Sequence, residues 1–460
     1  MSPDQDTIAA IATPIGQAGI GIIRISGPLC PEIVRKIFRP KNPTTTFKSH
    51  RLYLGQLYDP SSGNPIDEVL LSFMRRPHTY TREDVVEINS HSGYALLSKI
   101  LETVLDQGVR LARPGEFTLR AFLNGRIDLT QAEAVIDLIN SQSERGIYLS
   151  SQQVQGSFRA DIERLRQAAI GILAHAEVAI DFPEEETDTV FRKEGATAIE
   201  KELIAPIEGF IEAHKSRIWV DGINTVIAGR VNAGKSSLLN RLLNEQRAIV
   251  TPIPGTTRDI IESTINIEGI PLRLMDTAGI RKVKNEVERL GVDLTKRKLT
   301  EADFVLIVID QSRPLGRDDR DIILQSQGKR ALIVMNKIDL PPRIDHEANA
   351  ETFSLFPSVR ISALTGQGLD TLKKAMKDCI LGGRSDVTSS HAAPNLRHRR
   401  ALSDALQFFK DAVSETREEA PMEIVALELK SGLDALGEIT GETTSEDILN
   451  SIFSQFCLGK

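Results

Sequence analysis

The chain has 460 residues, of which 41% are hydrophobic and 26% are charged, which is the balance of a folded protein with several cores. Its length predicts about three domains, and its formal net charge of −7 argues against broad, nonspecific binding of nucleic acid while leaving room for a local basic patch. The three cysteines, Cys30, Cys379 and Cys457, suit neither a zinc site nor a disulfide framework, so we expect a reducing compartment.

The N-terminal stretch MSPDQDTIAAIATPIG has neither the basic start and apolar core of a secretory signal nor the arginines of a mitochondrial presequence. Apolar runs stay well short of the roughly 18 residues of a membrane span. The run at 304–309 predicts a core strand instead. We therefore expect a cytoplasmic, bacterial protein without a membrane segment.

Residues 1–122 predict a small α+β domain. Short β-like runs are separated by turn-forming residues such as SSGNP at 61–65. The predicted strands are 8–13, 21–26, 52–57, 69–74 and 85–89. One amphipathic helix is predicted over 94–107, ending at Gly108. The arginine-rich segment RPGEFTLRAFLNGRIDL at 113–129 is flanked by turns, and its periodicity alone favours a solvated connector.

The pattern becomes helical at Thr130, which is predicted to form a capping box with Glu133. Helical periodicity continues to about residue 181, where the segment PEEE at 183–186 predicts a solvated loop. A second helical stretch is predicted over 194–219.

Residues 383–460 begin with a predicted linker, the exit linker of the segment before them, and are helical beyond it. Predicted helices cover 401–418 and 422–437, and a last piece begins at Thr444 with Asp447 as its capping partner. The first of these helices carries an apolar stripe that needs a partner helix. The stripe comprises Leu402, Leu406, Phe409 and Val413.

Residues 220–382 alternate strand and helix, which predicts a three-layer α/β domain with a mainly parallel sheet. The predicted strands are 225–228, 272–275, 304–309, 331–335 and 358–361. We infer that the segments 123–219 and 383–460, whose apolar faces match, form one all-α domain into which this α/β domain is inserted.

Residues 229–237, GRVNAGKSS, follow a predicted strand and open a predicted helix, and they fit the pattern G-x-x-x-x-G-K-[ST] of a phosphate-binding loop. Gly229 and Gly234 let the backbone turn its N–H groups toward an anion at a helix start. Lys235 supplies a charge for the terminal phosphates, and the Ser236 hydroxyl is a ligand for Mg²⁺. A glycine turn that only joins a strand to a helix would match this loop, but not the motifs that follow it.

Two further motifs can sense a γ-phosphate. GTTRD at 255–259 offers the hydroxyl of Thr257 as a second Mg²⁺ ligand. DTAG at 276–279 offers Asp276 to the metal ion and the Gly279 N–H to the phosphate. Either motif alone is equally compatible with an ordinary loop.

The segment NKID at 336–339 indicates the base. The carboxylate of Asp339 can accept hydrogen bonds from both N1–H and N2–H₂ of guanine, whereas adenine would leave it unpaired. Asn336 braces the loop and can reach N7, and the stem of Lys337 can pack on the base. The segment SAL at 362–364 offers a backbone N–H to O6. The motifs together predict guanine nucleotide rather than adenine nucleotide.

The complete set predicted to bind GTP is Asn232, Ala233, Gly234, Lys235, Ser236, Ser237, Thr251, Pro252, Ile253, Pro254, Gly255, Thr256, Thr257, Asp276, Thr277, Ala278, Gly279, Asn336, Lys337, Asp339, Ser362, Ala363 and Leu364.

In this combination the motifs resemble the bacterial tRNA-modification GTPase family MnmE, also called TrmE, over essentially the whole chain. The segments that carry the resemblance are GIGIIRISG, EDVVEINSHSG, RPGEFTLRAFLNGRIDLTQAEA, the inserted GTPase domain and the C-terminal FCLGK. Val231, Pro254 and Leu458 depart from the family pattern without removing a liganding group. Pro254 would stiffen the switch loop.

The resemblance implies a reaction. With the FAD-containing protein MnmG (GidA), in a heterotetramer, the family adds an aminomethyl or carboxymethylaminomethyl group to C5 of the wobble uridine, U34, of certain tRNAs. A tetrahydrofolate derivative of the 5-formyl or methylene type donates the one-carbon unit. The resemblance also implies a homodimer formed through a folate-binding N-terminal domain. By position, the folate contacts are Arg24, Glu87, Arg126 and Lys460, although each charge is equally compatible with a surface ion pair.

Two features stay open at the level of sequence. Cys457 is either a nucleophile near the one-carbon donor or a small buried hydrophobe. The segment RHRR at 397–400 either contacts tRNA or forms a solvated basic helix start.

Ras-type GTPases carry a water-orienting glutamine just after the DTAG-type motif. Here that position is Ile280, followed by Arg281. Neutral oxygens of the phosphate loop and of 251–257 offer a site for a monovalent cation that would act where an arginine finger acts. The resemblance implies K⁺ with the ligands Asn232, Thr251, Ile253 and Thr256, and it implies Glu288 as general base through a second water. The candidate catalytic residues are Glu288, Asn232, Arg281 and Cys457.

Two rival interpretations remain. A GTPase of ribosome assembly would share the nucleotide motifs, although the folate-type N-terminal domain and the Cys-Leu-Gly-Lys tail argue against it. A GTP-gated scaffold that only arranges tRNA and its partner would be non-enzymatic.

Overall fold

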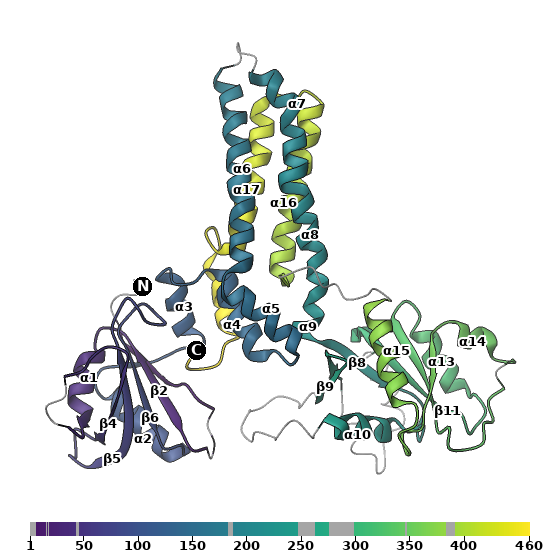
Figure 1. Cartoon of the computed structure of the whole chain (residues 1–460), viewed down its shortest axis with the longest axis horizontal. Coiled ribbons are helices and arrows are strands. Elements are labelled where there is room, and N and C mark those ends of the chain that lie inside the picture. The colour runs from purple at the N-terminus through teal and green to yellow at the C-terminus, as the bar shows by residue number, and fades with distance from the viewer. Residues whose placement is uncertain are drawn as a thin grey trace.

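The computed structural model describes residues 6–14, 16, 18–42, 46–182, 187–246, 263–275, 299–345, 347–382 and 392–460. Figure 1 shows a tall helical bundle with an N-terminal sheet domain on one side of its base and an α/β domain on the other. The predicted multidomain architecture is therefore confirmed. None of the helices in the described ranges has both the length and the apolar character needed to cross a membrane.

The N-terminal domain is built on one sheet. Its strands are β1 (Ile8–Ile11), β2 (Gly21–Ser26), β3 (Phe38–Pro40), β4 (Arg51–Tyr58), β5 (Pro65–Met74), β6 (Val85–Ser90) and β7 (Arg110–Leu111). Its helices are α1 (Cys30–Ile37), α2 (Tyr94–Leu105) and α3 (Glu116–Leu123). The strand order is β3-β4-β5-β6-β2-β1-β7, with all neighbours antiparallel except β1 and β7. The five predicted strands are all found where the sequence placed them.

The prediction of a single helix in this domain was wrong. Helices α1 and α3 have 8 residues each, so each supplies only about two turns of periodicity. Helix α3 lies in the segment 113–129 and buries Phe117 and Arg120, so the interpretation of that segment as a solvated connector was also wrong.

Strand β1 shows how the sheet is covered on both faces. Successive side chains of a strand point to opposite sides. Ala9 joins the core beneath α1 and α2, whereas its neighbours Ile8 and Ala10 pack with Phe117 of α3. The sheet is therefore buried on both faces at β1, and α3 is fixed against it.

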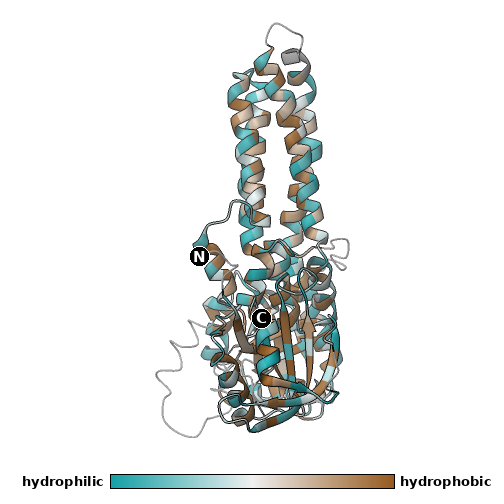
Figure 2. Cartoon of the chain, turned by 90° about the vertical axis from the view of Figure 1, so that its left-hand side faces the viewer, coloured by the Kyte–Doolittle hydropathy of each residue, from teal (hydrophilic) through white to brown (hydrophobic). Residues whose placement is uncertain are grey.

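The helical part combines two distant segments of the chain. Its first segment contains α4 (Leu129–Asn140), α5 (Glu144–Val154), α6 (Ser157–Asp181), α7 (Thr187–Ile199), α8 (Ala205–Ala213) and α9 (Ile218–Asp221). Its second segment contains α16 (Leu396–Arg417), α17 (Met422–Thr440) and α18 (Glu446–Phe453). One core holds Phe158 and Ile162 of α6 together with Leu402 and Phe409 of α16, so the predicted stripe does find partner helices. Figure 2 shows apolar and polar residues alternating along these helices, as expected for amphipathic helices in a bundle.

The predicted capping box of Thr130 and Glu133 was wrong. The N-cap of α4 is Asp128, whose carboxylate accepts the backbone N–H of Gln131 at 2.8 Å. Thr130 instead donates its hydroxyl to Asp128. An aspartate two residues earlier competes for the same role, and a carboxylate is the stronger acceptor at a positive helix end.

Other helix starts also differ from the predictions. Helix α7 begins at Thr187 rather than at 194, and α16 begins at Leu396 rather than at 401. Helix α18 follows Ser445 with no side-chain cap, so the predicted pair of Thr444 and Asp447 does not cap it. The loop predicted at 183–186 and most of the predicted exit linker lie outside the described residues.

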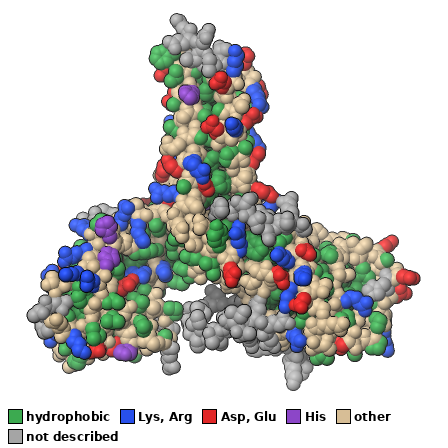
Figure 3. Space-filling view, in the orientation of Figure 1, with side chains coloured by type: hydrophobic (Ala, Val, Ile, Leu, Met, Phe, Trp, Pro, Cys, Tyr) green, Lys and Arg blue, Asp and Glu red, His purple; other side chains and the backbone are tan. Residues whose placement is uncertain are grey.

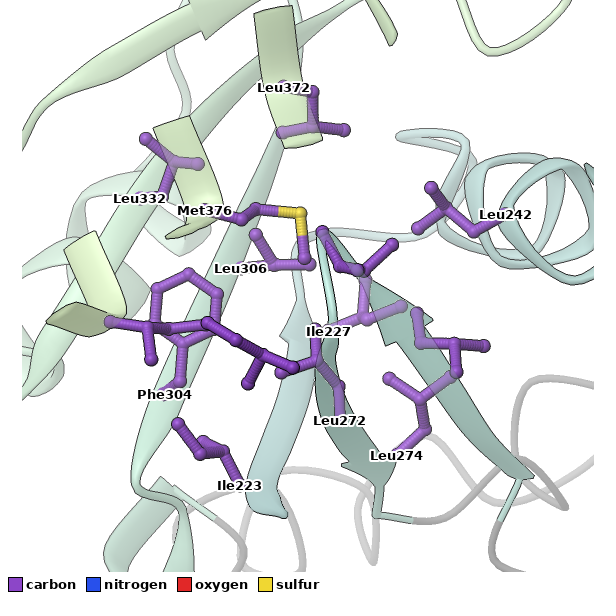
Figure 4. Packing of buried hydrophobic residues seen from close by; sticks show 14 of the residues in the cluster. Ile223, Ile227, Leu242, Leu272, Leu274, Phe304, Leu306, Leu332, Leu372 and Met376 are labelled. Atoms are coloured by element: carbon purple, nitrogen blue, oxygen red, sulfur yellow. The ribbon is translucent and has the colours of Figure 1, made fainter. Parts of the chain in front are cut away.

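The α/β domain has strands β8 (Ile223–Ala228), β9 (Ser263–Ile267), β10 (Ile270–Leu274), β11 (Phe304–Asp310), β12 (Arg330–Asn336) and β13 (Ser358–Arg360). Its described helices are α10 (Lys235–Gln246), α13 (Arg317–Gln325), α14 (Ala350–Ser354) and α15 (Leu369–Leu381). The sheet order is β13-β12-β11-β8-β10-β9, and only the pair β9 and β10 is antiparallel. The mainly parallel sheet is confirmed, whereas the edge strand β9 was not predicted. Figure 4 shows side chains of the strands and of α10 and α15 meeting in one core.

Helix α9, which leads into β8 of the α/β domain, and the turn before it are bonded to the helices at the base of the bundle. Ser143 donates its hydroxyl to the carbonyl of Trp219 at 2.7 Å. The guanidinium of Arg217 pairs with Asp137 of α4, with 2.6 Å between Nη2 and Oδ1. Both contacts are largely buried, so polar bonds hold the segment that precedes β8 to the base of the bundle.

Candidate functional site

The phosphate loop runs from the end of β8 to the start of α10, as predicted. Gly229 has a φ of 149°, and a Cβ there would lie 2.3 Å from the carbonyl oxygen of Val308. Gly234 has a φ of 99°, and a Cβ there would lie 2.1 Å from the side-chain nitrogen of Asn336. Only glycine fits these two positions, because the loop lies against two neighbouring strands.

Lys235 opens α10 and carries a positive charge that no anionic side chain of the described residues neutralises. Its Nζ donates to the carbonyl oxygens of Gly229 at 2.6 Å and Arg230 at 2.8 Å. Burial lowers the pKa of the Lys235 ammonium, and no carboxylate of the described residues pairs with it. A phosphate beside this ammonium would supply the missing negative charge. The loop therefore fits a nucleotide phosphate, and Ser236 in the first turn of α10 is placed next to it.

The segment NKID at 336–339, predicted to bind the base and called the base loop here, is bound to the phosphate loop through one side-chain amide. The side chain of Asn336 donates to the carbonyl oxygen of Ala233 at 2.9 Å. Its oxygen accepts the backbone N–H groups of Lys337 at 2.8 Å and Ala363 at 3.0 Å. Asn336 is 2% exposed, so this amide braces three loop segments from inside the domain.

Asp339 and Lys337 each have a partner that orients them. Ser362 donates its hydroxyl to Asp339 at 2.6 Å, which leaves the second carboxylate oxygen for a ligand. Lys337 has a φ of 69°, and its ammonium pairs with Asp310 at 2.7 Å. Sequence reasoning missed Asp310, although it ends β11 directly opposite Asn336 in the strand register. Burial alone would raise the pKa of Asp310, but hydrogen bonds from Lys337 and Ser312 outweigh burial and lower it.

Much of the predicted catalytic apparatus lies outside the described residues. That part comprises Thr251, Pro252, Ile253, Pro254, Gly255, Thr256, Thr257, Asp276, Thr277, Ala278, Gly279, Arg281 and Glu288. Of the predicted K⁺ ligands, Asn232 is described, and it lies exposed in the phosphate loop with a φ of 64°.

A second polar cluster lies in the N-terminal domain and brings the predicted folate residues together. Arg24 and Glu87 are cross-strand partners of β2 and β6, and Arg24 Nε donates to Glu87 Oε1 at 2.9 Å. Arg24 Nη1 also donates to the carbonyl oxygen of Gly459 at 2.9 Å. The ion pair that the sequence left open as an alternative to folate binding is therefore present between Arg24 and Glu87. Arg24 also contacts the C-terminal tail.

The C-terminal tail closes this cluster. Gly459 has a φ of 88°, and a Cβ there would lie 2.6 Å from the Cα of Ala12. The carbonyl oxygen of Lys460 accepts the N–H of Phe117 at 3.2 Å. Burial and the charge of Arg24 lower the pKa of the Lys460 ammonium, so two cations lie close together without full neutralisation. Such a site is suited to an anionic ligand.

Tyr80 connects the fourth predicted folate residue to the cluster. The guanidinium of Arg126 lies 4.7 Å from the centre of the Tyr80 ring, and that of Arg24 lies 5.8 Å from it. Sequence reasoning missed Tyr80, because nothing in its local pattern distinguishes it from a core aromatic residue.

The exposure of the side chains decides between the alternatives that the sequence left open for Cys457 and for the segment 397–400. Cys457 is exposed, so its interpretation as a small buried hydrophobe was wrong. Within the segment 397–400, Arg397 binds Glu133 and His398 is 3% exposed, so a wholly solvated helix start was also wrong. Only Arg399 and Arg400 are exposed there.

The sheet order and the loop between β8 and α10 define the class: a P-loop nucleotide-binding protein whose α/β domain lies in the chain between two segments of a helical bundle. Comparison with known families agrees with this. The family description "GTP-binding protein TrmE N-terminus" matches residues 7–126, and "MnmE helical domain" matches residues 129–457. The chain belongs to the MnmE family of tRNA modification GTPases.

Its relatives are matched along almost their entire length. The chain is 46% identical to "tRNA modification GTPase MnmE" of Geobacter metallireducens over 458 residues, covering 99% of each chain. It is 43% identical to the protein of the same name from Natranaerobius thermophilus over 457 residues, covering 99% of this chain and 100% of the relative. Among solved structures, the G domain of the T. maritima FeoB iron transporter is 25% identical and covers 34% of this chain and 98% of that chain. Its TM-score of 0.25 is too low to support a comparison of folds.

Proposed function

We propose that this chain hydrolyses GTP and, with an FAD-containing partner of the MnmG (GidA) type, installs an aminomethyl or carboxymethylaminomethyl group at C5 of the wobble uridine, U34, of tRNA. It takes the one-carbon unit from a tetrahydrofolate derivative and works in the cytoplasm as a homodimer within a heterotetramer. The observation that carries this proposal is the presence of two separate cationic sites in one chain, each suited to an anionic ligand. One lies around Lys235 and the other around Arg24 and Lys460.

In the nucleotide site each described residue has a distinct task. Lys235 exchanges its two carbonyl partners for phosphate oxygens, and the helix start of α10 adds its positive end. Asp339 selects guanine, because its orientation is fixed by Ser362 while one oxygen stays available. Asn336 holds base and phosphates at a constant distance, which supports accurate placement of the γ-phosphate.

Two cations complete the proposed nucleotide site. Mg²⁺ would be held by Ser236 and Thr257, and it would neutralise charge on the phosphates. K⁺ would be held by Asn232, Thr251, Ile253 and Thr256 and would take the place of an arginine finger. The support from the described residues is the exposed position of Asn232 in the phosphate loop. The proposed general base is Glu288, and Arg281 is a further proposed catalytic residue.

In the N-terminal site the cations of Arg24, Arg126 and Lys460 bind the carboxylate and carbonyl oxygens of the folate, and Glu87 accepts from the pterin. The thiol of Cys457 is exposed on the tail that closes this site, which fits a chemical role beside the one-carbon unit. The proposed folate site is therefore built from residues of the N-terminal domain, such as Arg24, together with residues of the C-terminal tail, such as Lys460.

Homodimerisation is supported by an exposed apolar face on the N-terminal sheet. Leu52 is 63%, Leu54 40% and Leu70 42% exposed, and Leu54 and Leu70 are direct cross-strand neighbours of β4 and β5. Exposed leucines on adjacent strands are costly in water, so a second copy of the sheet domain is the proposed cover.

The decisive experiment is mass spectrometry of the nucleoside at position 34 in tRNA from a strain that lacks this chain. We expect U34 to lose its C5 substituent and to regain it when the wild-type gene is restored. Unchanged U34 in the deleted strain would refute the proposal. If U34 is unchanged, copurification of the chain with ribosomal subunits would favour a role in ribosome assembly. In a second experiment, the chain is supplied without the side chains of Arg24 and Lys460. A C5 substituent that is still present on U34 in that strain would favour a scaffold.

A further inference from the structure

The ion pair of Lys337 and Asp310 differs from the charged pairs at the surface of the α/β domain. Figure 3 shows Lys and Arg side chains next to Asp and Glu side chains on the visible face of this domain. Pairs of exposed side chains contribute little to stability, because water and salt screen them. The side chain of Asp310, in contrast, is 2% exposed, and that of Lys337 is 28% exposed. The ammonium of Lys337 is therefore bound to a carboxylate inside the domain, and its hydrocarbon stem is left at the surface.

Both oxygens of the Asp310 carboxylate are used, and each has a different partner. Oδ2 accepts from the ammonium of Lys337 at 2.7 Å. Oδ1 accepts from the backbone N–H of Ser312 at 3.0 Å and from its hydroxyl at 2.6 Å, which forms a turn directly after β11. Arg313, the other cation nearby, is 62% exposed and lies 3.9 Å from Oδ2. The turn therefore fixes the direction of the carboxylate, and Lys337 is its close cationic partner.

The backbone of Lys337 is held as firmly as its ammonium. Its φ of 69° lies in the left-handed region that favours glycine, so the surrounding bonds impose this conformation. Its N–H donates to the side-chain oxygen of Asn336 at 2.8 Å. Its carbonyl oxygen accepts from the N–H of Leu340 at 3.0 Å and from the side-chain amide of Gln311 at 3.4 Å. Because Gln311 follows Asp310 in the chain, one short segment after β11 holds both ends of Lys337.

We infer that Asp310 is a positioning residue for the nucleobase, an inference that rests on the proposed function. It holds the Lys337 stem extended as a fixed apolar platform for the flat face of guanine. With its backbone fixed at one end and its ammonium at the other, the stem loses rotational freedom before the ligand binds. The edge of the base is read separately, by Asp339. Asp310 therefore sets how tightly a base that fits the loop is held, and Asp339 sets which base is preferred.

The test compares the affinities of the full chain for GTP and for inosine triphosphate (ITP), whose base lacks the C2 amino group of guanine, by calorimetry. The test variant is Asp310→Asn. Its amide oxygen still accepts from Ser312, so the turn is kept, whereas its NH₂ group would face the ammonium of Lys337 and the bond is lost. We expect GTP and ITP to bind about tenfold more weakly, because the stem must be ordered on binding. The preference for GTP over ITP should equal that of the wild type.

A double-mutant cycle with Lys337→Met separates positioning from a purely structural role of Asp310. Methionine keeps an apolar stem but has no ammonium to anchor, so Lys337→Met should also bind both nucleotides about tenfold more weakly. Adding Asp310→Asn to Lys337→Met should then cause no further loss of GTP affinity. A further tenfold loss in the double variant would show that Asp310 acts through the turn or the fold, and the inference would fall. A Lys337→Met variant that binds both nucleotides like the wild type would overturn it as well, even if Asp310→Asn fails to fold.

The matched control is Asp303→Asn, the same substitution just before the opposite end of β11. Asp303 is exposed, and its carboxylate accepts the N–H of Asn224 at 3.2 Å. This variant should bind both nucleotides like the wild type. If Asp310→Asn behaves like Asp303→Asn while Asp339→Asn changes the preference between GTP and ITP, this inference falls and the proposed role of the base loop stands. If Asp339→Asn leaves that preference unchanged, the proposed role of the base loop is wrong and the inference falls with it.

Discussion

The side-chain amide of Asn336 donates to the carbonyl oxygen of Ala233 at 2.9 Å, so the loop that we propose reads the base is bonded directly to the loop that we propose holds the phosphates. These residues are more than a hundred positions apart in the chain, and the bond is buried. The same amide also accepts from Lys337 and Ala363, so the two loops are held in a fixed relative position.

Base selectivity should depend on Asp339. Asp339→Asn replaces an acceptor with a mixed donor and acceptor, so GTP should bind more weakly and xanthosine triphosphate, which has an acceptor at C2, more tightly. Competition titrations with the two nucleotides measure this directly. A variant that still prefers GTP would contradict the assignment of the base loop.

Gly234→Ala should abolish tight nucleotide binding. Its Cβ would lie 2.1 Å from the Asn336 amide, and its backbone has a φ of 99°. Left-handed strain costs about 1–2 kcal/mol, and the clash adds to it, so we expect roughly a tenfold or larger loss of GTP affinity. The control is Gly328→Ala in the same domain, with a φ of 80° but nothing within 4 Å of its Cβ. Calorimetric GTP affinities that fall equally in both variants would show that strain alone, and not the contact with Asn336, explains the effect.

GTP turnover should be fast in K⁺ and slow in Na⁺. An arginine finger is worth roughly 10³–10⁵ in rate, and a cation in that place can contribute similarly. Asn232→Ala should remove the difference between the two salts. Glu288→Ala should stop hydrolysis while GTP still binds. Equal rates in K⁺ and Na⁺ at matched ionic strength would overturn the proposed mechanism.

Folate binding should depend on Arg24 and not on the nucleotide site. Arg24→Ala removes the ion pair with Glu87 and the bond to the tail carbonyl of Gly459, so a reduced folate should bind at least about tenfold more weakly. Calorimetry should show unchanged GTP affinity, because the two sites lie in different domains. The control is Arg39→Ala, because Arg39 is an exposed arginine of the same domain whose guanidinium lies over the ring of Tyr58. Undiminished folate affinity in Arg24→Ala would remove Arg24 from the site.

The stability of the helical bundle should depend on Glu133. This carboxylate accepts from Arg397 at 2.7 Å and from His398 at 2.6 Å, and Glu133 is 8% exposed. Glu133→Gln leaves Arg397 without its counter-charge, which should cost about 3 kcal/mol. The control is Glu208→Gln, whose partner Lys410 and own side chain are both about half exposed. It should cost less than about 1 kcal/mol. Urea unfolding followed by helical circular dichroism measures both values.

The same cluster should make the bundle less stable in acid. Burial alone would raise the pKa of Glu133, but the hydrogen bonds from His398 and Arg397 and the charge of Arg397 outweigh burial and hold it far below 4.5, its ordinary value. Burial lowers the pKa of His398 below its ordinary 6.5, and its Nδ1 accepts the N–H of Asn395, which requires the neutral ring. The unfolded chain therefore takes up protons first at both groups, so stability should fall as pH drops below about 6.5 and again below about 4.5. In Glu133→Gln the lower step should shrink. A urea midpoint that stays constant over this pH range in the wild type would contradict the argument.

Local sequence was sufficient for features that depend on neighbours in the chain. The phosphate loop from Gly229 to Ser236 was placed correctly because glycine, lysine and a following helix determine its form within a few residues. The strands β2, β6 and β11 were placed correctly because their periodicity or continuous apolar character shows burial directly. The short helix α3 was missed, because two turns of apolar spacing are too few to stand out from a loop.

Only the tertiary structure decided which side chains meet. The sequence gives no sign that Asp310 pairs with Lys337, that Tyr80 lies between Arg24 and Arg126, or that His398 is buried against Glu133. Each of these contacts joins residues from separate elements, and its energy depends on burial, which excludes water and strengthens the interaction. Local sequence was therefore enough to predict the family and to locate the nucleotide motifs. The folded chain decided which charges are paired and which remain available to bind a ligand.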